Sequence, residues 1–512
     1  MTILRSYLEG RWMAGEGKPR TIEDATTGSA FATVASDGLD RGAALRYARD
    51  VGGPALRAMT FAERGAILKK LAEEIHTHRD ELLILSRQGG TTRGDGKFDV
   101  DGAAGTISYY AYLGKKLGDV VVLADGEPEN VLRSKRFVGQ HLLVPRRGVA
   151  IHINAFNFPA WGMAEKAAVA ILAGVPVISK PGTATAPLAV RIVELWVESG
   201  ALPEGAFSLL AGSAGDLLDH VGPQDCVAFT GSSGTGLAIR SHAQVLATGA
   251  RVNVEADSLN ASVLAPDVEL DSDTFGMFLG DVARDMTQKA GQKCTAVRRI
   301  VVPADKVDGV AEALIDRISG AIVGDPAQRG ITVGPVASRA QKRDVEAGCS
   351  QLAETANLVW RGEAPEGDGF FVAPALYLTD AGVEAAYVHE HEVFGPVATL
   401  VTYDGSSDEA IAIVAAGGGG LVASVYTDDA AWGGQVMLGI APWSGRIYWG
   451  SRKVADQGSG PGTVLPNFVH GGPGKAGGGE ELGGERGLRF YQQRVAVQAD
   501  RALLKRSLEG LL

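Results

Sequence analysis

Cysteine is scarce in this chain of 512 residues, because only Cys226, Cys294 and Cys349 occur. They show neither CxxC spacing nor a neighbouring pair of histidines. Such isolated cysteines exclude a disulfide framework and give no zinc-binding pattern. The sequence therefore predicts no metal site and no disulfide.

Long apolar runs are also missing. No run approaches the ~18–20 residues that cross a bilayer. The first ten residues lack the apolar stretch of a signal peptide. We expect a cytoplasmic protein with no membrane partner.

An excess of basic charge is absent as well. Sixty acidic against 49 basic residues give a net charge of −11. Nucleic-acid phosphates require a basic face, so this balance argues against a nucleic-acid partner, although it allows a local basic groove for an anionic cofactor. The chain is 45% hydrophobic and 21% charged, which is typical of a globular protein, and its length predicts two or three domains.

The region 148–255 alternates between apolar β-type runs and helical stretches. This alternation predicts a parallel sheet that helices cover on both faces. The expected strands are Gly148–Ile153, Val175–Ser179, Ala206–Leu210, Cys226–Thr230 and Arg251–Glu255. The expected helices between them are Pro159–Ala173, Ala186–Ser199, Ala214–Val221 and Gly234–His242.

Polar groups follow four of these strands. They are the amide of Asn157, the ammonium of Lys180, a glycine loop at 231–236 that opens a helix, and the carboxylate of Glu255. Ligands of such sheets bind beyond the carboxyl ends of the strands. The glycine loop is neither a Rossmann GxGxxG nor a Walker loop. Each group could be only a cap or turn, but four strand ends together predict a ligand site.

The rest of the chain divides into less regular regions. Residues 59–87 and 101–116 have helical periodicity, and 256–400 reads as a second α/β region. The basic, alternating stretch 129–147 is a plain hairpin or an arm that pairs with another subunit, and we favour the arm. Residues 458–488 are rich in glycine and form an ordered loop or lid, or else are disordered. From Leu488 the chain is β-like again and could pair with 129–147.

Cys294 lies in the small-residue segment from Gln288 to Ala296. A thiolate adds readily to a carbonyl carbon, and a nearby positive charge or helix N-terminus lowers a thiol pKa. The alternative is a small buried hydrophobic residue, which is what most free cysteines are. We interpret Cys294 as a nucleophile.

Short motifs along nearly the whole chain resemble those of the NAD(P)-dependent aldehyde dehydrogenase superfamily. In family order they are Phe156-Asn157-Phe158-Pro159, Lys180-Pro181, Phe229-Thr230-Gly231-Ser232 with Gly236, Val254-Glu255, Gly291-Gln292-Lys293-Cys294 and Glu392-Val393-Phe394-Gly395-Pro396. Each motif is short, but their joint order and spacing make a chance match very improbable.

The resemblance implies an α/β fold, with two parallel-sheet domains and a small β oligomerisation arm. Residues 1–128 and 148–256 would form the dinucleotide-binding domain, and 257–460 the catalytic domain. Residues 129–147 and 487–505 would form the arm of a homodimer. Residues 461–486 would be a glycine-rich loop that closes the site.

The resemblance also implies catalytic roles. Cys294 would attack the aldehyde, and the Asn157 amide with the Cys294 backbone N–H would hold the oxyanion. Glu255 would be the base for deacylation and for thiol activation. Lys166 and Glu481 would relay protons from Glu255. The simpler alternatives are a capping Asn157, a surface ion pair at Glu255 and a snorkelling Lys166.

By the same resemblance, Lys180 would bind the cofactor ribose, Glu392 the nicotinamide ribose, and Ser232 the phosphates at a helix N-terminus. The other cofactor contacts would be Ile153, Asn154, Gly182, Thr183, Gly212, Thr230, Gly231, Gly236, Ala256 and Phe394. Many NAD-preferring relatives carry a glutamate at the position of Thr183, where it would repel a 2′-phosphate. We expect NADP to be preferred and NAD to be used weakly.

The substrate expectation rests on the stretch 470–484. It resembles the aldehyde dehydrogenase portion of phenylacetate ring-opening enzymes and, as the better match, the stand-alone family members that oxidise a CoA-linked semialdehyde during benzoate degradation. The expected product is the acid, because relatives that make a CoA thioester generally lack the glutamate at position 255. A free aliphatic or aromatic semialdehyde is a close alternative. A catalytically silent scaffold and a cysteine hydrolase are further alternatives, although no histidine lies near Cys294 along the chain. One departure from the family pattern, Ala256-Asp257-Ser258, leaves the angle of the turn after Glu255 open.

Overall fold

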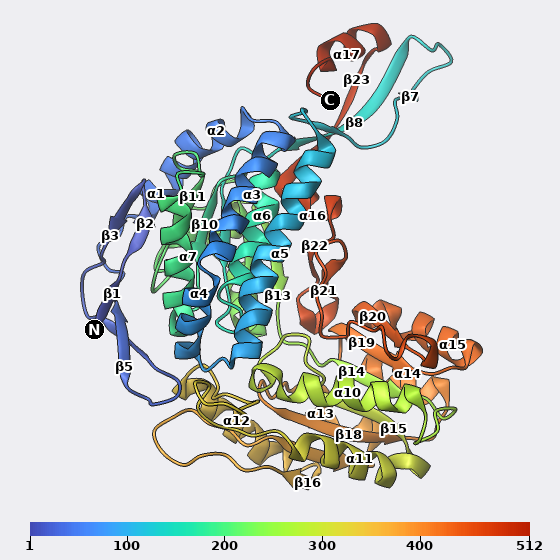
Figure 1. The fold of residues 1–512 in the computed structure, drawn as a ribbon. Coiled ribbons are helices and arrows are strands. Elements are labelled where there is room, and N and C mark those ends of the chain that lie inside the picture. Colours follow the sequence, from blue (N-terminus) through green and yellow to red (C-terminus); the bar gives the residue numbers. More distant parts are fainter.

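Two seven-stranded sheets form the framework of the chain in the computed structural model, which describes residues 1–512 (Figure 1). In the first sheet the strand order is β13-β12-β9-β10-β11-β2-β3. Its members are β2 (Ser6–Leu8), β3 (Arg11–Met13), β9 (Ala150–Ile153), β10 (Val177–Lys180), β11 (Phe207–Leu209), β12 (Cys226–Thr230) and β13 (Arg251–Glu255). The five later strands are parallel, and the hairpin β2–β3 extends the sheet antiparallel to β11.

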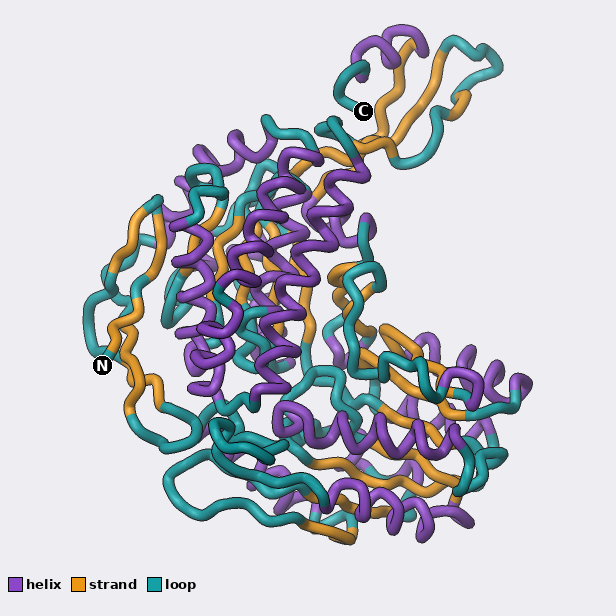
Figure 2. Tube along the Cα trace, viewed as in Figure 1, coloured by secondary structure: helices purple, strands orange, loops and turns teal.

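Helices cover both faces of this parallel sheet, as the alternating sequence predicts (Figures 1 and 2). α6 is apolar almost all round and packs between α5 and the strands β9 and β10, so nearly every residue in it is buried. α3 begins with a capping box formed by Thr60 and Glu63. The helices are α1 (Arg41–Tyr47), α2 (Gly53–Arg57), α3 (Phe61–Thr77), α4 (Arg79–Ser86), α5 (Arg93–Leu117), α6 (Trp161–Leu172), α7 (Ala186–Glu198), α8 (Ser233–Arg240) and α9 (Ala243–Thr248).

One predicted helix of this region is wrong. The stretch Ala214–Val221 forms only a 3₁₀ turn over Leu217–His220. Gly215 has a φ of +54°, which is outside the right-handed helical region, and Gly222-Pro223 ends the segment.

The second sheet has the order β16-β17-β18-β15-β14-β19-β20 and is parallel except for β16. Its strands are β14 (Ala261–Leu264), β15 (Arg299–Pro303), β16 (Asn357–Arg361), β17 (Ala375–Thr379), β18 (Val397–Tyr403), β19 (Gly420–Tyr426) and β20 (Ser444–Gly450). Its helices are α10 (Asp273–Thr287), α11 (Val307–Ser319), α12 (Arg339–Leu352), α13 (Ala386–Glu390), α14 (Ser407–Ala416) and α15 (Ala430–Ile440). The predicted second α/β region is therefore present.

The predicted arm stands away from the body of the molecule (Figure 1). β8 (Phe137–Pro145) pairs antiparallel with β23 (Gln492–Asp500) over nine residue pairs, and β6 (Leu123–Ala124) and β7 (Glu129–Asn130) pair with β8. The pairing of the two predicted segments is confirmed. The predicted boundary at 487–505 differs, because Glu485–Tyr491 is a helix (α16) and Arg501–Leu508 is another (α17).

The glycine-rich segment is an ordered hairpin of β21 (Val469–Gly472) and β22 (Gly479–Leu482), and it lies between the two large sheets (Figure 1). Hydrogen bonds join this hairpin to both sheets. The N–H of Ala256, just after β13, donates to the Ala476 carbonyl at 3.0 Å, and the N–H of Lys475 donates to the Gly418 carbonyl at 3.0 Å. A separate N-terminal sheet contains β1 (Thr2–Leu4), β4 (Arg20–Glu23) and β5 (Ala30–Val34).

Gly291 provides a test of how tightly the segment before Cys294 is held. Its φ is +68°, and a Cβ added there would stand 2.0 Å from the Gly395 carbonyl oxygen. We expect Gly291→Ala to lower the free energy of unfolding by more than ~2 kcal/mol, since it combines backbone strain with a clash against main chain. Urea unfolding measures this change.

Gly276→Ala is the matched control. Gly276 lies in the neighbouring helix α10, and a Cβ there meets nothing within 4 Å. This substitution should be neutral or stabilising by ~0.4–1 kcal/mol. Equal effects of the two substitutions would contradict the close approach at Gly291.

Candidate active site

Cys294 follows a left-handed turn at the end of α10. Lys289, Ala290 and Gly291 all have positive φ, at 53°, 52° and 68°. This conformation is costly for the two residues that have side chains, and such backbone strain is found most often at functional sites. The backbone N–H of Lys289 donates to Asp95 at 3.0 Å, which secures the turn.

The loop that carries the cysteine is also held from the side of the second sheet. The Asn260 side-chain amide donates to the Cys294 carbonyl at 2.8 Å and to the Ala296 carbonyl at 2.9 Å. The Arg298 guanidinium donates to the Gly291 carbonyl at 2.9 Å. The position of the sulfur is therefore determined by buried hydrogen bonds on both sides of the residue.

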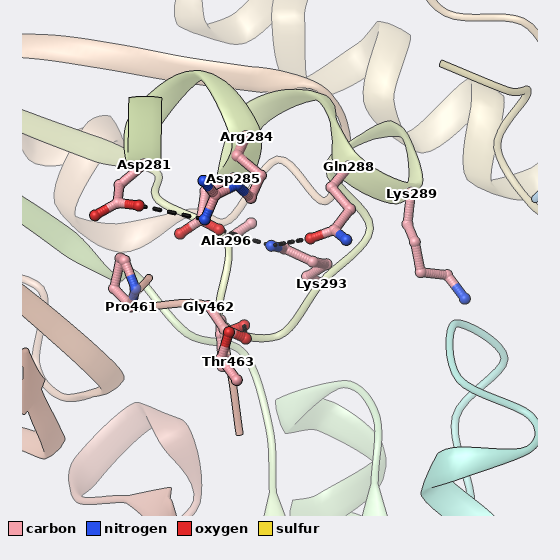
Figure 3. Close-up of polar contacts among 12 residues, drawn as sticks. Asp281, Arg284, Asp285, Gln288, Lys289, Lys293, Ala296, Pro461, Gly462 and Thr463 are labelled. Atoms are coloured by element: carbon pink, nitrogen blue, oxygen red, sulfur yellow. Dashed lines mark hydrogen bonds and ion pairs between the residues drawn. The ribbon is translucent and has the colours of Figure 1, made fainter. Parts of the chain in front are cut away.

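The two lysines of this segment have other partners. The Lys293 ammonium is bound to Asp285 at 2.6 Å and to Gln288 at 2.9 Å (Figure 3). Lys289 lies over the Phe158 ring at 4.2 Å. Burial raises the pKa of the Cys294 thiol well above its ordinary value, and the negative charge of Glu255 raises it further. The expectation that a nearby positive charge of this segment lowers that pKa is therefore wrong.

A histidine lies beside the sulfur, although it is far away along the chain. The Nε2 of His470, on β21, is 3.7 Å from the Cys294 Sγ and 3.3 Å from Glu255. Burial alone would lower the pKa of His470, but the Glu255 carboxylate outweighs it and raises the pKa. Burial would likewise raise the pKa of Glu255, but His470 lowers it to about 2. The two side chains form a buried ion pair.

Two cavities meet at Cys294. One has a volume of about 290 Å³ and is mostly apolar, with Phe98, Phe158, Trp161, Val464 and Pro466 among its walls. The other has about 210 Å³ and a more polar lining, which includes Asn157, Thr230, Ser232, Glu255 and Glu392. Cys294 is the residue that the two linings share. A molecule in the apolar cavity and one in the polar cavity could therefore both reach the sulfur.

Donors for a developing oxyanion are present at the same point. Asn157 donates one amide hydrogen to the Gln292 carbonyl at 3.1 Å, which leaves its second hydrogen for a ligand. The backbone N–H of Cys294 donates no hydrogen bond within the chain. The structure thus brings Asn157 and Cys294 together, as predicted.

Behind Glu255 lies a group of buried charges. Lys166 is 3.0 Å from Glu165 and 3.0 Å from Glu481, and Glu481 also accepts from Asn253 at 3.1 Å. The carboxylates of Glu165, Glu255 and Glu481 all lie within 4.8 Å of one another. Burial raises the pKa of Glu165 to about 8, although Lys166 opposes this shift. Burial would lower the pKa of Lys166, but these carboxylates raise it.

The predicted cofactor residues gather at the carboxyl edge of the first sheet. Ile153 pairs with Lys180 across β9 and β10, and Thr230 pairs with Glu255 across β12 and β13, so these strand ends are in register. Asn154 donates to Ser179 at 3.0 Å. The remaining members lie in the loops and helix that follow these strands: Gly182, Thr183, Gly212, Gly231, Ser232, Gly236 and Ala256.

Several of these groups fit a nicotinamide nucleotide. The Thr230 hydroxyl and the side-chain amide oxygen of Asn154 are buried without a partner in the chain. Ser232 caps the N-terminus of α8, where anions bind favourably. A Cβ on Gly182 would stand 2.7 Å from the Phe156 backbone, so only glycine fits there. The 210 Å³ of the polar cavity is enough for the nicotinamide end of such a cofactor.

Glu392 and Phe394 form the opposite wall. Glu392 accepts from the Ser258 N–H at 3.0 Å and from Arg298 at 3.1 Å, and Arg298 lies over the Phe394 ring. Burial raises the pKa of Glu392 to about 7, although Arg298 opposes the shift. The turn Ala256-Asp257-Ser258, which departs from the family pattern, thus holds Glu392 in place.

Two groups of side chains could hold a metal ion. Glu255, Cys294 and His470 each offer one ligand atom within 4.8 Å of the others, and so do Glu165, Glu255 and Glu481. The first set has the donor types that zinc accepts. The absence of a metal site stays a prediction.

Comparison with known proteins decides the family. A family model described as "Aldehyde dehydrogenase family" matches residues 12–497. The chain belongs to the aldehyde dehydrogenase family. It is therefore an oxidoreductase that acts on aldehydes, and the resemblance seen in the sequence is confirmed.

Relatives and solved structures agree with this assignment. The chain is 45% identical to "3,4-dehydroadipyl-CoA semialdehyde dehydrogenase" of Aromatoleum evansii over 92% of this chain and 93% of that protein. It is 28% identical to the NADP-dependent succinate-semialdehyde dehydrogenase of Escherichia coli over 79% and 81% of the two chains. Gamma-glutamyl-gamma-aminobutyraldehyde dehydrogenase from Burkholderia cenocepacia shares the fold with a TM-score of 0.84 at 24% identity, over 97% and 96% of the two chains.

The predicted fold class is thereby confirmed for this aldehyde dehydrogenase. A complex of betaine aldehyde dehydrogenase from Staphylococcus aureus with NAD⁺ has the same fold, with a TM-score of 0.83, 23% identity and 97% of each chain covered. No helix of the chain has the length and apolar character that a membrane crossing needs.

Four groups in the site were not predicted from the sequence: His470, Glu165, Asn260 and the aromatic walls of the apolar cavity. His470 stands directly before Gly471-Gly472 in a stretch that carried the family resemblance, which is the one signal that could have singled it out. The argument that no histidine lies near Cys294 does not hold in three dimensions. Family membership, not the absence of a histidine, is what argues against a cysteine hydrolase.

Glu165 gives a prediction on pH-dependent stability. Its pKa is raised in the folded protein, so between about pH 4.5 and 8 the folded state holds a proton that the unfolded state releases. The free energy of unfolding of the unsubstituted protein, relative to that of Glu165→Gln, should therefore fall as the pH rises through this window. Urea unfolding at several pH values measures the difference.

Glu366→Gln is the control for this comparison, because Glu366 is exposed and has no ion-pair partner. Its difference from the unsubstituted protein should not change with pH. If the difference in the free energy of unfolding for Glu165→Gln is also independent of pH, folded Glu165 holds no proton that the unfolded chain releases. That result would contradict the prediction.

Proposed function

We propose that this enzyme oxidises the aldehyde end of a CoA-linked semialdehyde to a carboxylic acid, with NADP⁺ as the preferred acceptor and water as the second substrate. The observation that carries the proposal is the position of Cys294 as the shared wall of an apolar and a polar cavity. The 45% identity to a dehydrogenase of 3,4-dehydroadipyl-CoA semialdehyde supports the substrate class and makes that compound the candidate.

The reaction begins at the sulfur. The thiolate of Cys294 attacks the aldehyde carbon, a C–S bond forms, and the carbonyl oxygen becomes an oxyanion in a thiohemiacetal. The free amide hydrogen of Asn157 and the Cys294 N–H are placed to hold that oxyanion. Loss of one such donor typically costs ~10²–10³ in rate.

When bound, a nicotinamide nucleotide would supply the hydride acceptor that allows the adduct to become a thioester on Cys294. The residues of the chain would orient the cofactor and enclose the site. Glu392 is the group placed to hold the nicotinamide ribose, and its carboxylate is fixed by Ser258 and Arg298. Thr230, at the end of β12, and Asn154, directly after β9, offer buried side-chain oxygens that have no partner in the chain.

Glu255 is the proposed base for hydrolysis of the thioester. It removes a proton from water, the hydroxide adds to the acyl carbon, and the C–S bond breaks to release the acid. The proton can leave Glu255 through Glu481, Lys166 and Glu165, whose contacts form a continuous buried group. In total, aldehyde, NADP⁺ and water give acid, NADPH and one proton.

The size of the apolar cavity bears on the substrate. About 290 Å³ is small for a ligand pocket and suits the acyl chain of a semialdehyde, while a CoA group would remain outside. The same cavity would accept a free semialdehyde, the class of substrate that the E. coli relative's name states. Oxidation of a free semialdehyde is therefore the second candidate function.

The site after β10 supports the NADP⁺ preference. Thr183 begins the 3₁₀ turn Thr183–Thr185, which packs against β4, and it brings no carboxylate that would repel a 2′-phosphate. Burial lowers the pKa of Lys180, and the charge of Arg20 on β4 lowers it further, which means that two cations stand close together here. Clustered cations of this kind favour an additional phosphate.

We also propose that the domains follow the two large sheets and that the arm joins two copies into a homodimer. Val495 on β23 is 41% exposed, and Leu132 in the arm is 62% exposed. Apolar side chains on a projecting sheet are typical of a surface that a second copy covers. The β21–β22 hairpin is the proposed closing element of the site.

The substrate prediction can be checked by following reduced-nicotinamide absorbance with NADP⁺. We expect a much higher kcat/KM for the CoA-linked semialdehyde than for a panel of free aldehydes, and no turnover by Cys294→Ala. Cys349→Ser is the control, because Cys349 lies in the second core, away from the site. Equal kcat/KM for simple aldehydes would contradict a CoA-linked substrate and leave the oxidation of aldehydes intact.

The cofactor prediction uses the same assay with both nucleotides. We expect kcat/KM to be higher with NADP⁺, and we expect Thr183→Glu to reverse the order, because the new carboxylate repels the 2′-phosphate. Arg20→Gln should raise the KM for NADP⁺ and leave that for NAD⁺ unchanged. An equal or greater kcat/KM with NAD⁺ in the unsubstituted enzyme would refute the preference.

A further inference from the structure

The proposed reaction requires a thiolate, and the surroundings of Cys294 oppose one. Burial and the charge of Glu255 both raise the pKa of the thiol. Neither lysine of the cysteine segment compensates, because Lys293 is bound to Asp285 and Lys289 lies over Phe158. Some other cation has to stabilise the sulfur when it attacks.

Two cations are near the sulfur: Arg446, which donates to the Pro461 carbonyl, and His470, which contacts the sulfur itself. The Nε2 of His470 lies 3.7 Å from the sulfur and 3.3 Å from Glu255, and the imidazole is buried at 2% exposure. We propose that His470 is a catalytic residue: as an imidazolium held by Glu255, it turns its Nε2–H to Cys294 and stabilises the attacking thiolate. The identity of the electrophile rests on the proposed function, whereas the activation of the thiol does not.

The charges around the imidazole are consistent with this role. Glu255 at the end of β13 and Glu165 on α6 favour the protonated ring, and Arg446 on β20 opposes it. The indole of Trp161 is 5.9 Å from the ring and excludes water on that side. A buried cation is costly unless it is paired, and the carboxylate of Glu255 is the pairing group.

The proton balance is complete within the site. The S–H bond of Cys294 breaks and its proton passes to the Glu255 carboxylate. The Nε2–H of His470, released from that carboxylate, then faces the sulfur, so an imidazolium–thiolate pair replaces the imidazolium–carboxylate pair. As the C–S bond forms, the proton on Glu255 can move to Glu481, whose oxygen lies within 4.8 Å, and Glu255 is again a carboxylate for the hydrolytic step.

The test is the rate at which iodoacetamide alkylates Cys294 in the cofactor-free enzyme between pH 5.5 and 9.5. Cys349→Ser serves as the background and Cys294→Ala as the blank, while Cys226 is buried. This measurement needs neither aldehyde nor cofactor. A failure of the substrate or cofactor proposal would therefore leave it unaffected.

The variants are His470→Gln, which keeps a donor without a charge, and His470→Phe, which keeps the ring shape. We expect both to shift the midpoint of the rate profile upward by at least about one pH unit, which lowers alkylation at pH 7 about tenfold. His76→Gln, at an exposed histidine on α3, should behave as the unsubstituted enzyme does. With aldehyde and cofactor, kcat should fall in the His470 variants and the KM for the cofactor should not change.

Unchanged alkylation profiles in both variants would overturn the proposal. Either variant alone decides, because each removes the charge of the imidazolium beside the sulfur. In either case the oxidation assay with Cys294→Ala reports separately on the proposed function.

Discussion

The ion pair between His470 and Glu255 is the interaction on which the site depends. His470 belongs to the β21–β22 hairpin, Glu255 ends the last strand of the first sheet, and Cys294 follows the first long helix of the second α/β region. This contact of 3.3 Å and the 3.7 Å contact between His470 and Cys294 therefore join three separate parts of the chain at the sulfur. Because an unpaired buried charge is strongly unfavourable, either partner alone would destabilise this arrangement.

The cost of an unpaired buried charge also explains the arrangement of charges behind the ion pair. Three carboxylates within 4.8 Å of one another face two cations, Lys166 and His470. The negative charge exceeds the positive by one, and a proton on one carboxyl group relieves that excess. Glu165, with its raised pKa, is the group that holds it. A site arranged in this way can accept and return protons, as the proposed hydrolysis of a thioester requires.

Much of the fold and part of the site could be predicted from local sequence. The strand Cys226–Thr230 and the strand Arg251–Glu255 have the predicted bounds, because continuous apolar runs between turn residues are typical of buried parallel strands. The helix expected at Ala214–Val221 is only a turn, since positive-φ glycine overrides helical periodicity. The segment 458–488 contains two short strands, which carry too little periodicity to be seen in the sequence.

By itself the sequence determined the family, and it predicted the nucleophile and the strand ends that would face a ligand, because each depends on short motifs or on local periodicity. Only the tertiary structure decided which groups touch Cys294. The two lysines beside it in sequence turn to other partners, and a histidine 176 residues away lies next to the sulfur. Contacts between side chains follow from the packing of whole elements, and burial then sets the charge of each group. Neither packing nor burial can be read from spacing along the chain.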